Sequence, residues 1–256
     1  MTEGLAALTR AFELDPRNKR AQRNLATAYA LSGRRDEAAT IRRGLANAEL
    51  ATARRDSEAQ PTSAAPARRE AAQLIRLGRP EEALAAAQRA LALDPASPDS
   101  IELALQASLI TGRRDDARAL LHRLVSASGR REGSFADAAE LAVLLGEPTV
   151  AAAEADLYRE VTTRPSEAER VKGYSAAASG DWHDARRHFR EALARRSTDC
   201  CAQTWLGLAD HRLGHRTEAV HAADRAEALS MCECAARRAL RDALKTPTPG
   251  ELPAET

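Results

Sequence analysis

Aromatic residues make up only 3% of the 256-residue sequence, and valine and isoleucine are scarce as well. Because these residue types supply most β-strands, their scarcity nearly excludes an all-β fold or a doubly wound sheet. Alanine and leucine, both strong helix formers, carry most of the hydrophobic share. Residues 1–14 show no basic region followed by a continuous apolar run, and no window of the sequence reaches roughly 18 apolar residues. We therefore expect an all-α cytoplasmic protein without membrane insertion.

Neither positive nor negative charge predominates. The 38 basic and 37 acidic residues give a net charge of +1, so we expect no nucleic-acid partner. Lysine is almost absent, with only Lys19, Lys172 and Lys245, so arginine provides nearly all of the basic residues. Together with the abundant alanine, this bias indicates a bacterial, GC-rich genome. Four cysteines are too few for a secreted disulfide scaffold.

A repeat of 34 residues runs through the sequence. Its first sign is a glycine column with five members at this interval and a sixth further upstream: Gly78, Gly112, Gly146, Gly180 and Gly214, preceded by Gly33. An alanine follows each glycine five residues later: Ala38, Ala83, Ala117, Ala151, Ala185 and Ala219. Glycine readily adopts the left-handed backbone conformation that ends many helices, and the small side chain of alanine lets two antiparallel helices approach closely. Each unit is therefore predicted to be a helical hairpin, with helix A before the glycine and helix B after it.

The repeat resembles the tetratricopeptide repeat family at further positions. Leu25-Ala26 and Leu206-Gly207 match its large and small residues in helix A. Phe189 with Ala192, and Leu121 with Leu124, match its helix B, while Leu14-Asp15-Pro16 and Leu93-Asp94-Pro95 match its closing turn. The resemblance implies a right-handed α-solenoid of one half repeat, six full repeats and a C-terminal capping helix. Gly129, Thr163, Ser197 and Met231 replace the closing proline, so we expect those units to be less regular.

The repeat also predicts how the chain is divided. The expected parts are a half repeat plus one full repeat (1–52), an insertion acting as a flexible joint (53–63), five contiguous units (64–233), a capping helix (234–245) and a disordered tail (246–256). Met1 falls in the middle of a unit, which leaves open whether the stack starts with a lone helix B or belongs to a longer chain.

No known catalytic motif is present in the sequence, and no strand is expected that could carry one. We therefore expect a protein that binds other proteins and is not an enzyme. In the family, helices A line a concave groove that holds a peptide or helix of a partner. The corresponding residues are basic near the N-terminus, acidic in the middle and partly aromatic near the C-terminus: Arg20, Arg23, Asn24, Arg68, Arg69, Arg76, Asp99, Glu102, Asp137, Glu140, Arg170, Tyr174 and Trp205.

Two other readings of this surface stay open. The same residues could be an ordinary solvated face of mixed charge, since charged residues are common on any surface. The chain could also be a sensor or interaction module of a larger regulator or enzyme assembly. A third class, an enzyme that uses the histidines of the last two units, would need a bound metal. The oligomeric state is left open by the sequence.

The four cysteines lie near the C-terminus in two pairs, Cys200 with Cys201 and Cys232 with Cys234. The pairs are about one repeat apart, so both map to the same edge of the stack. Four thiolates there could hold a structural zinc ion between the last hairpin and the cap. Because the spacing differs from the usual zinc knuckle, disulfides and free thiols remain alternatives.

Overall fold

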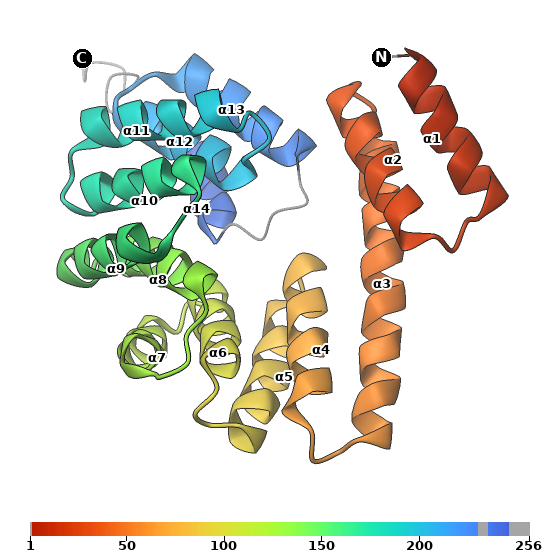
Figure 1. Cartoon of the computed structure of the whole chain (residues 1–256), viewed down its shortest axis with the longest axis horizontal. Coiled ribbons are helices and arrows are strands. Elements are labelled where there is room, and N and C mark those ends of the chain that lie inside the picture. The colour runs from red at the N-terminus through yellow and green to blue at the C-terminus, as the bar shows by residue number, and fades with distance from the viewer. Residues whose placement is uncertain (1, 230–234, 246–256) are drawn as a thin grey trace, which may run out of the picture.

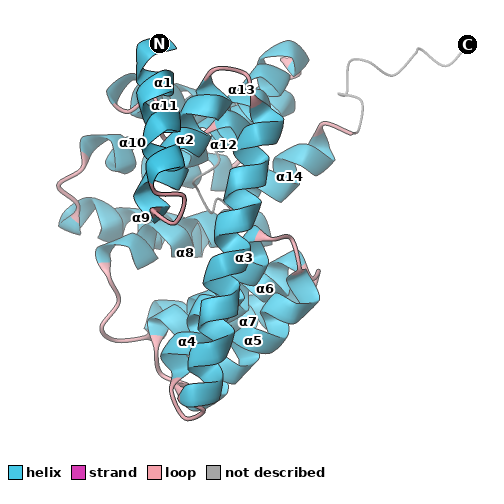
Figure 2. Cartoon of the chain, turned by 90° about the vertical axis from the view of Figure 1, so that its right-hand side faces the viewer, coloured by secondary structure: helices cyan, strands magenta, loops and turns pink. Residues whose placement is uncertain are grey.

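The computed structural model describes residues 2–229 and 235–245, which form fourteen helices and no strand. The expected all-α solenoid is confirmed, and Figures 1 and 2 show helical hairpins stacked along a curved path. The helices are α1 (Thr2–Leu14), α2 (Lys19–Leu31), α3 (Arg35–Ala59), α4 (Ala64–Arg76), α5 (Pro80–Leu93), α6 (Pro98–Ile110), α7 (Arg114–Ser126), α8 (Glu132–Leu145), α9 (Pro148–Val161), α10 (Pro165–Ala178), α11 (Trp182–Arg195), α12 (Cys200–Arg212), α13 (Arg216–Ala228) and α14 (Ala236–Ala243).

The turn inside each hairpin depends on its glycine. Gly146, which follows α8, has a φ angle of 77°, in the left-handed region where a side chain would be strained. Its N–H donates to the carbonyl of Val143 (3.1 Å), and the N–H of Glu147 donates to the carbonyl of Ala142 (2.9 Å). These bonds satisfy the last carbonyls of α8. All six glycines of the column have a positive φ angle, as the repeat predicts.

The alanine column marks where the two helices of a hairpin cross. Each of its six members is fully buried, with no exposed surface. The small side chain lets the two helices of each hairpin, from α2 with α3 to α12 with α13, pack directly on each other. Leucines and a few aromatic residues fill the remaining space in three successive clusters along the stack.

The segment predicted as a joint is partly helical. Helix α3 continues to Ala59, so the loop between α3 and α4 contains only residues 60–63. The inserted residues therefore lengthen helix B of the first full repeat. Arg54 in this extension donates to Glu70 on α4 (3.1 Å), which links the extension to the next hairpin. Flexibility at this point stays a prediction.

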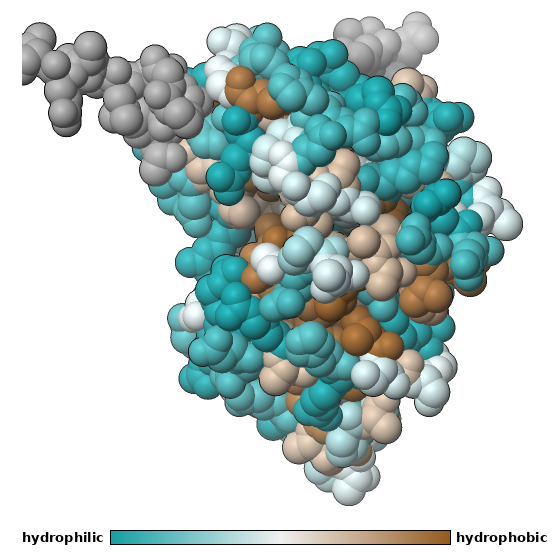
Figure 3. Space-filling model, turned by 90° about the vertical axis from the view of Figure 1, so that its left-hand side faces the viewer, coloured by the Kyte–Doolittle hydropathy of each residue, from teal (hydrophilic) through white to brown (hydrophobic). Residues whose placement is uncertain are grey.

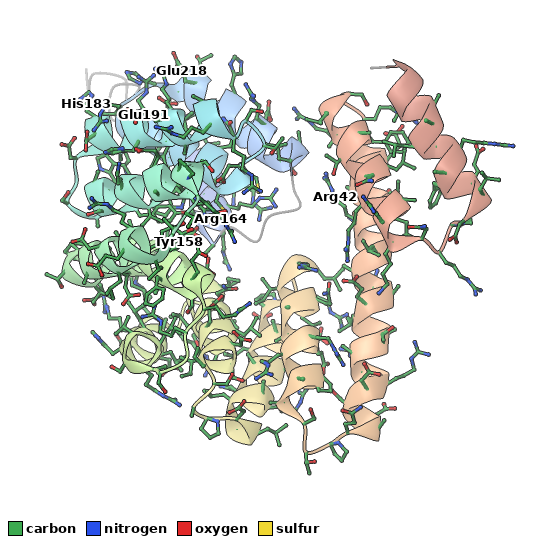
Figure 4. The ribbon with its side chains drawn as sticks, in the orientation of Figure 1. Arg42, Tyr158, Arg164, His183, Glu191 and Glu218 are labelled. Carbon is green, nitrogen blue, oxygen red and sulfur yellow. The ribbon has the colours of Figure 1, made fainter. Side chains whose placement is uncertain are left out.

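The two ends of the stack meet, because the arc curls until α2 and α3 face α13 (Figure 1). Arg35 on α3 pairs with Asp224 on α13 (3.2 Å). Arg42, labelled in Figure 4 on the inner side of α3, donates to the carbonyl of Ala228 at the end of α13 (3.0 Å). Burial, and secondly the charge of Arg237, lower the pKa of Arg42. This contact between the ends was not predicted from the sequence.

Within the described parts of the chain, no helix combines the length and the apolar character that crossing a bilayer requires. The predicted tail, 246–256, lies outside the described residues. Helix α14 falls within the segment predicted as a cap, and its position is described below.

Candidate functional site

A cluster of charged side chains lies at the N-terminal part of the predicted groove. Lys19 and Arg23 on α2 and Arg76 on α4 all point to one carboxylate, Glu49 of α3, at 3.5, 3.0 and 3.6 Å. The Glu49 side chain is 16% exposed, whereas the three cations are 55%, 45% and 44% exposed. Three cations on one carboxylate leave an excess of two positive charges where α2, α3 and α4 meet. We call these four residues the Glu49 cluster.

The other predicted basic residues differ in their accessibility. Arg20 and Asn24 are exposed on α2. Arg69 is also exposed and pairs with Asp56 at 2.6 Å. Arg68, in contrast, is engaged: it reaches Asp94 (3.3 Å) and the hydroxyl groups of two serines at the start of α6. Arg68 therefore joins α4 to the loop after α5 and is less available to a partner than the sequence suggested.

The acidic middle of the groove is a connected set of side chains. Asp99 pairs with Arg131 at 2.8 Å. Asp137 hydrogen-bonds Glu102, and burial together with the charge of Glu140 raises the pKa of Asp137 to about 6. The structure thus brings three of the four predicted carboxylates, Glu102, Asp137 and Glu140, into one group. The charges of Arg170 and Arg131 lower the pKa of Asp137 and so partly offset the negative charge of this group.

Glu140 is buried and accepts two hydrogen bonds from distant parts of the chain. One comes from Nε1 of Trp205 on α12 (3.1 Å), and the other from the backbone N–H of Ala236 on α14 (3.2 Å). The curvature of the stack therefore brings α8 against α12 and α14. The sequence singled out Glu140 but gave no indication of these partners.

The predicted aromatic end of the groove needs a correction. Tyr174 and Trp205 are each only 1% exposed and pack against each other at a centroid distance of 5.2 Å. Both rings also contact Phe189, so they form the core of the C-terminal units and do not face a partner. Arg170 lies above Tyr174 and approaches Asp199 at 3.7 Å. With so few aromatic residues in the chain, burial of these rings is the expected result.

Helix α14 lies beside the last hairpin (Figure 1). It packs mainly on α12, with a smaller contact to α13. Leu240 and Ala236 are buried in the same cluster as Trp205 and Leu208. Arg238 donates to the carbonyl of Ile110 at the end of α6. The helix therefore does more than cap the last hairpin, because it also contacts α8 and α6.

The cysteines are only partly described. Cys201 is a buried residue outside any disulfide, and Cys200 is disulfide-bonded. Cys232 and Cys234 lie outside the described residues. A zinc ion held by all four thiolates would first require reduction of the disulfide at Cys200. The zinc site stays a prediction.

The histidines of the last two units are dispersed. His188 has two acidic neighbours, since its Nδ1 atom lies 2.9 Å from Glu169 and its Nε2 atom 3.4 Å from Asp184. His215 has one, Asp210, at 3.4 Å from its Nδ1 atom. Burial alone would raise the pKa of Glu169, but hydrogen bonds from Lys172 and His188 outweigh it and lower the pKa to about 2. Figure 4 labels His183 and Glu191 near the outer edge of α11.

Among the described residues, one group has metal-ligand geometry, namely Glu169, His188 and Glu191. Two cations already occupy it, because Lys172 lies 2.8 Å from Glu169 and Arg187 lies 3.0 Å from Glu191. A divalent metal ion would have to displace both. The group is therefore better described as a network of ion pairs that joins α10 to α11.

Two buried polar pairs were not predicted from the sequence. Arg130 forms an ion pair with Glu154, and both side chains are only 4% exposed. Tyr158 donates to Glu167 at 2.5 Å, and Glu167 also accepts from Arg164 at 3.0 Å. Burial, with the bond to Glu167 second, raises the pKa of Tyr158 to about 12. Figure 4 shows Tyr158 and Arg164 at the junction of α9 and α10, where they connect neighbouring units.

An apolar patch lies outside the groove. Leu157 and Val161 on α9 are 42% and 50% exposed. Figure 3 shows hydrophobic residues gathered midway down the face on the side of α7 and α9, with hydrophilic residues around them. Both helices are of the B type, so this patch belongs to the outer face of the solenoid.

No protein-family model matches the sequence, and no curated protein matches it. Several solved structures, in contrast, are similar to this chain. A tetratricopeptide repeat protein from Parabacteroides merdae superposes with a TM-score of 0.57 at 13% identity, covering 94% of this chain and 90% of that one. TTC0263, a tetratricopeptide repeat protein of Thermus thermophilus, gives a TM-score of 0.54 at 22% identity over 72% of this chain and 100% of its own.

A chain of the APC/C hetero-tetramer Cut9–Hcn1 is also similar, with a TM-score of 0.55 at 16% identity. The match covers 94% of this chain but only 46% of the other, so this chain spans less than half of that protein. Similarity at such low identity concerns the fold. The regular hairpins, the glycine turns and these superpositions agree, and the chain therefore has the tetratricopeptide repeat fold.

Proposed function

We propose that the chain is a non-catalytic interaction scaffold that binds an acidic segment of a partner protein at the N-terminal part of its inner face. The repeat fold supports the general class, because stacked hairpins present a long continuous surface. The solved structures that share the fold include a chain of a hetero-tetramer, which agrees with a role in assemblies. The acidic nature of the segment is inferred from the charges of the Glu49 cluster.

The excess positive charge of the Glu49 cluster carries the proposal. The three cations are about half exposed and outnumber the one carboxylate that they contact, so a partner carboxylate can bind them without displacing Glu49. Arginine also binds a carboxylate with two parallel hydrogen bonds. Arg20 and Asn24, exposed on the same helix as Arg23, add donors next to the cluster. A glutamate-rich segment or a C-terminal carboxylate fits these donors.

Charge reversal of the cluster tests the proposal. We expect the triple variant Lys19→Glu, Arg23→Glu, Arg76→Glu to bind a fluorescent glutamate-rich peptide at least tenfold more weakly than the unmodified chain, as measured by anisotropy at low salt. A matched control changes three exposed arginines elsewhere, Arg43, Arg190 and Arg195, to glutamate. This control gives the same change in net charge but leaves the cluster intact.

The comparison between the two variants decides the question. Equal loss of binding in both variants would mean that only net charge matters and would refute a site at the cluster. Affinity capture from a cell lysate with the unmodified chain and both variants then identifies the natural partner, as the protein lost only with the triple variant. Circular dichroism checks that all three proteins keep the same helix content.

The alternative of a module within a larger regulator or enzyme assembly uses the same surface. The two proposals differ only in the partner, which in the alternative is another domain of the same assembly and not a separate protein. Absence of nucleic-acid binding and a cytoplasmic location stay predictions that rest on composition.

A further inference from the structure

The contact between the two ends of the arc is small and polar. Arg35 on α3 pairs with Asp224 on α13 (3.2 Å). Two turns later on α3, Nη2 of Arg42 donates to the carbonyl of Ala228 (3.0 Å). The arginines are seven residues apart and their partners four apart, so the two bonds lie on one face of each helix. We call these four residues the latch.

Hydrophobic packing does not hold the latch closed. None of the three buried hydrophobic clusters of the described residues contains side chains of both α3 and α13. Leu31 at the end of α2 is 55% exposed and Val220 on α13 is 39% exposed, so closure of the arc buries neither. The hairpin of α13, in contrast, packs across Ala219, which is fully buried. The ends are therefore joined much more weakly than the helices within a unit.

Arg42 makes closure costly. Its Nη2 atom also reaches the carbonyl of Ala26 on α2 (3.4 Å), while its buried Nε atom has no hydrogen-bond partner among the described residues. Burial and the charge of Arg237 lower the pKa of Arg42, and the charge of Glu227 acts in the opposite direction. A partly buried guanidinium group that bonds only to carbonyl oxygens has lost water without gaining a carboxylate. Hydration of Arg42 on opening therefore offsets the loss of its bond to α13.

The second bond of the latch adds little. The side chains of Arg35 and Asp224 are 51% and 45% exposed. Exposed ion pairs contribute little to stability, because water and salt screen both charges. The closed and the open arc are therefore close in free energy, and a change at the latch shifts the balance between them.

The structure also indicates which part of the arc moves. Glu140 accepts from Trp205 and Arg238 donates to the carbonyl of Ile110, so α6, α8, α12 and α14 are tied together. Rotation that separates α3 from α13 must therefore lie between α3 and α6, at the junctions of the early hairpins. Small rotations at successive junctions of a solenoid add up, so no hairpin has to unfold.

We propose that the latch is a releasable clasp, and that the chain exchanges between the closed arc of Figure 1 and an open arc in which α3 has separated from α13. The open arc admits an internal segment of a partner to the inner face from the side, and the closed arc surrounds it. This proposal goes beyond the proposed function and does not depend on an acidic partner, because it concerns contacts within this chain.

The distance between the ends tests the proposal. Spin labels are attached to azide-bearing amino acids at Asn47 of α3 and Glu218 of α13, which are exposed and outside the latch, so the native cysteines stay unlabelled. Double electron–electron resonance should give a short and a long distance in the full-length chain. Arg35→Glu places a second carboxylate opposite Asp224 and should raise the fraction at the long distance by roughly threefold or more, the size expected for reversal of an exposed pair. An acidic residue suits the first turn of α3, so the helix is retained.

A charge swap and a matched control decide the outcome. Combining Arg35→Glu with Asp224→Arg restores opposite charges and should return the long-distance fraction to that of the unmodified latch. Arg43→Glu, at an exposed position of α3 outside the latch, gives the same change in net charge and should leave the fraction unchanged. A single short distance in every variant would overturn the proposal. An equal increase in Arg43→Glu, or a charge swap that stays open, would overturn it as well.

Discussion

Gly173 offers a sharp test of the packing between α10 and α11. A Cβ atom at this position would lie 2.5 Å from Cε1 of Phe189 and 2.8 Å from both Cδ1 and Cζ. The ring cannot retreat, because it is fully buried and packed against Tyr174 (5.8 Å between centroids) and Trp205 (6.0 Å). Overpacking costs about 1 to 3 kcal/mol, and three contacts below 3 Å with a rigid ring favour the upper end. The higher helix propensity of alanine offsets about 1 kcal/mol of this destabilisation. Gly173→Ala should therefore destabilise by about 2 kcal/mol.

Gly44 in α3 is the matched control, because a Cβ atom added there would meet nothing within 4 Å, so the same substitution adds only helix propensity. We expect Gly44→Ala to stabilise by about 0.5 to 1 kcal/mol. Urea unfolding followed by tryptophan fluorescence reports on the C-terminal units, where both tryptophans lie. Circular dichroism follows the whole stack, whose units can unfold separately. If Gly173→Ala were as stable as the unmodified chain, the close packing of Phe189 on α10 would be wrong.

Three further predictions concern other parts of the chain. Ala117→Leu should destabilise by about 1 to 3 kcal/mol in urea unfolding, because the fully buried alanine lies at a hairpin crossing. The pKa of Asp137 is raised to about 6 by burial and by Glu140, so its stabilising contribution is present below about pH 4 and is lost as the pH rises through 6. Asp137→Asn should therefore raise the free energy of unfolding at pH 8 by about 1 to 2 kcal/mol and flatten its pH dependence between pH 4 and 7. If Cys200, Cys201, Cys232 and Cys234 bind zinc, the reduced protein should carry about one equivalent of metal by mass spectrometry. Metal-free reduced protein whose four thiols all react with a mild reagent would contradict this last prediction.

The hairpins were predictable because their determinants are local. A glycine at the end of helix A needs only its own turn to adopt a positive φ angle, and an alanine at the crossing needs only the partner helix of its own unit. Gly146 and Ala151 show both effects within six residues of chain. Fold class and repeat length follow from such columns without knowledge of the rest of the molecule.

The groove residues were less predictable, because their exposure depends on how strongly the stack curves. Tyr174 and Trp205 occupy positions that face the concave side in the family, yet both are buried here. Trp205 reaches Glu140, 65 residues earlier in the chain, because α8 and α12 come together on the inner side. A sequence period fixes each unit but not the small rotation between units, and that rotation accumulates along the stack.

The same curvature produces two features that the sequence did not reveal, the contact between the ends and the hydrogen bonds of α14 to α8 and α6. Arg42 bonds to the end of α13, and the charge of Arg237 on α14 is a secondary cause of the lowered pKa of Arg42. The charge of Glu227 acts in the opposite direction. Arg42 and Ala228 are 186 residues apart, and a repeat period that fixes each unit separately does not encode a contact over that separation.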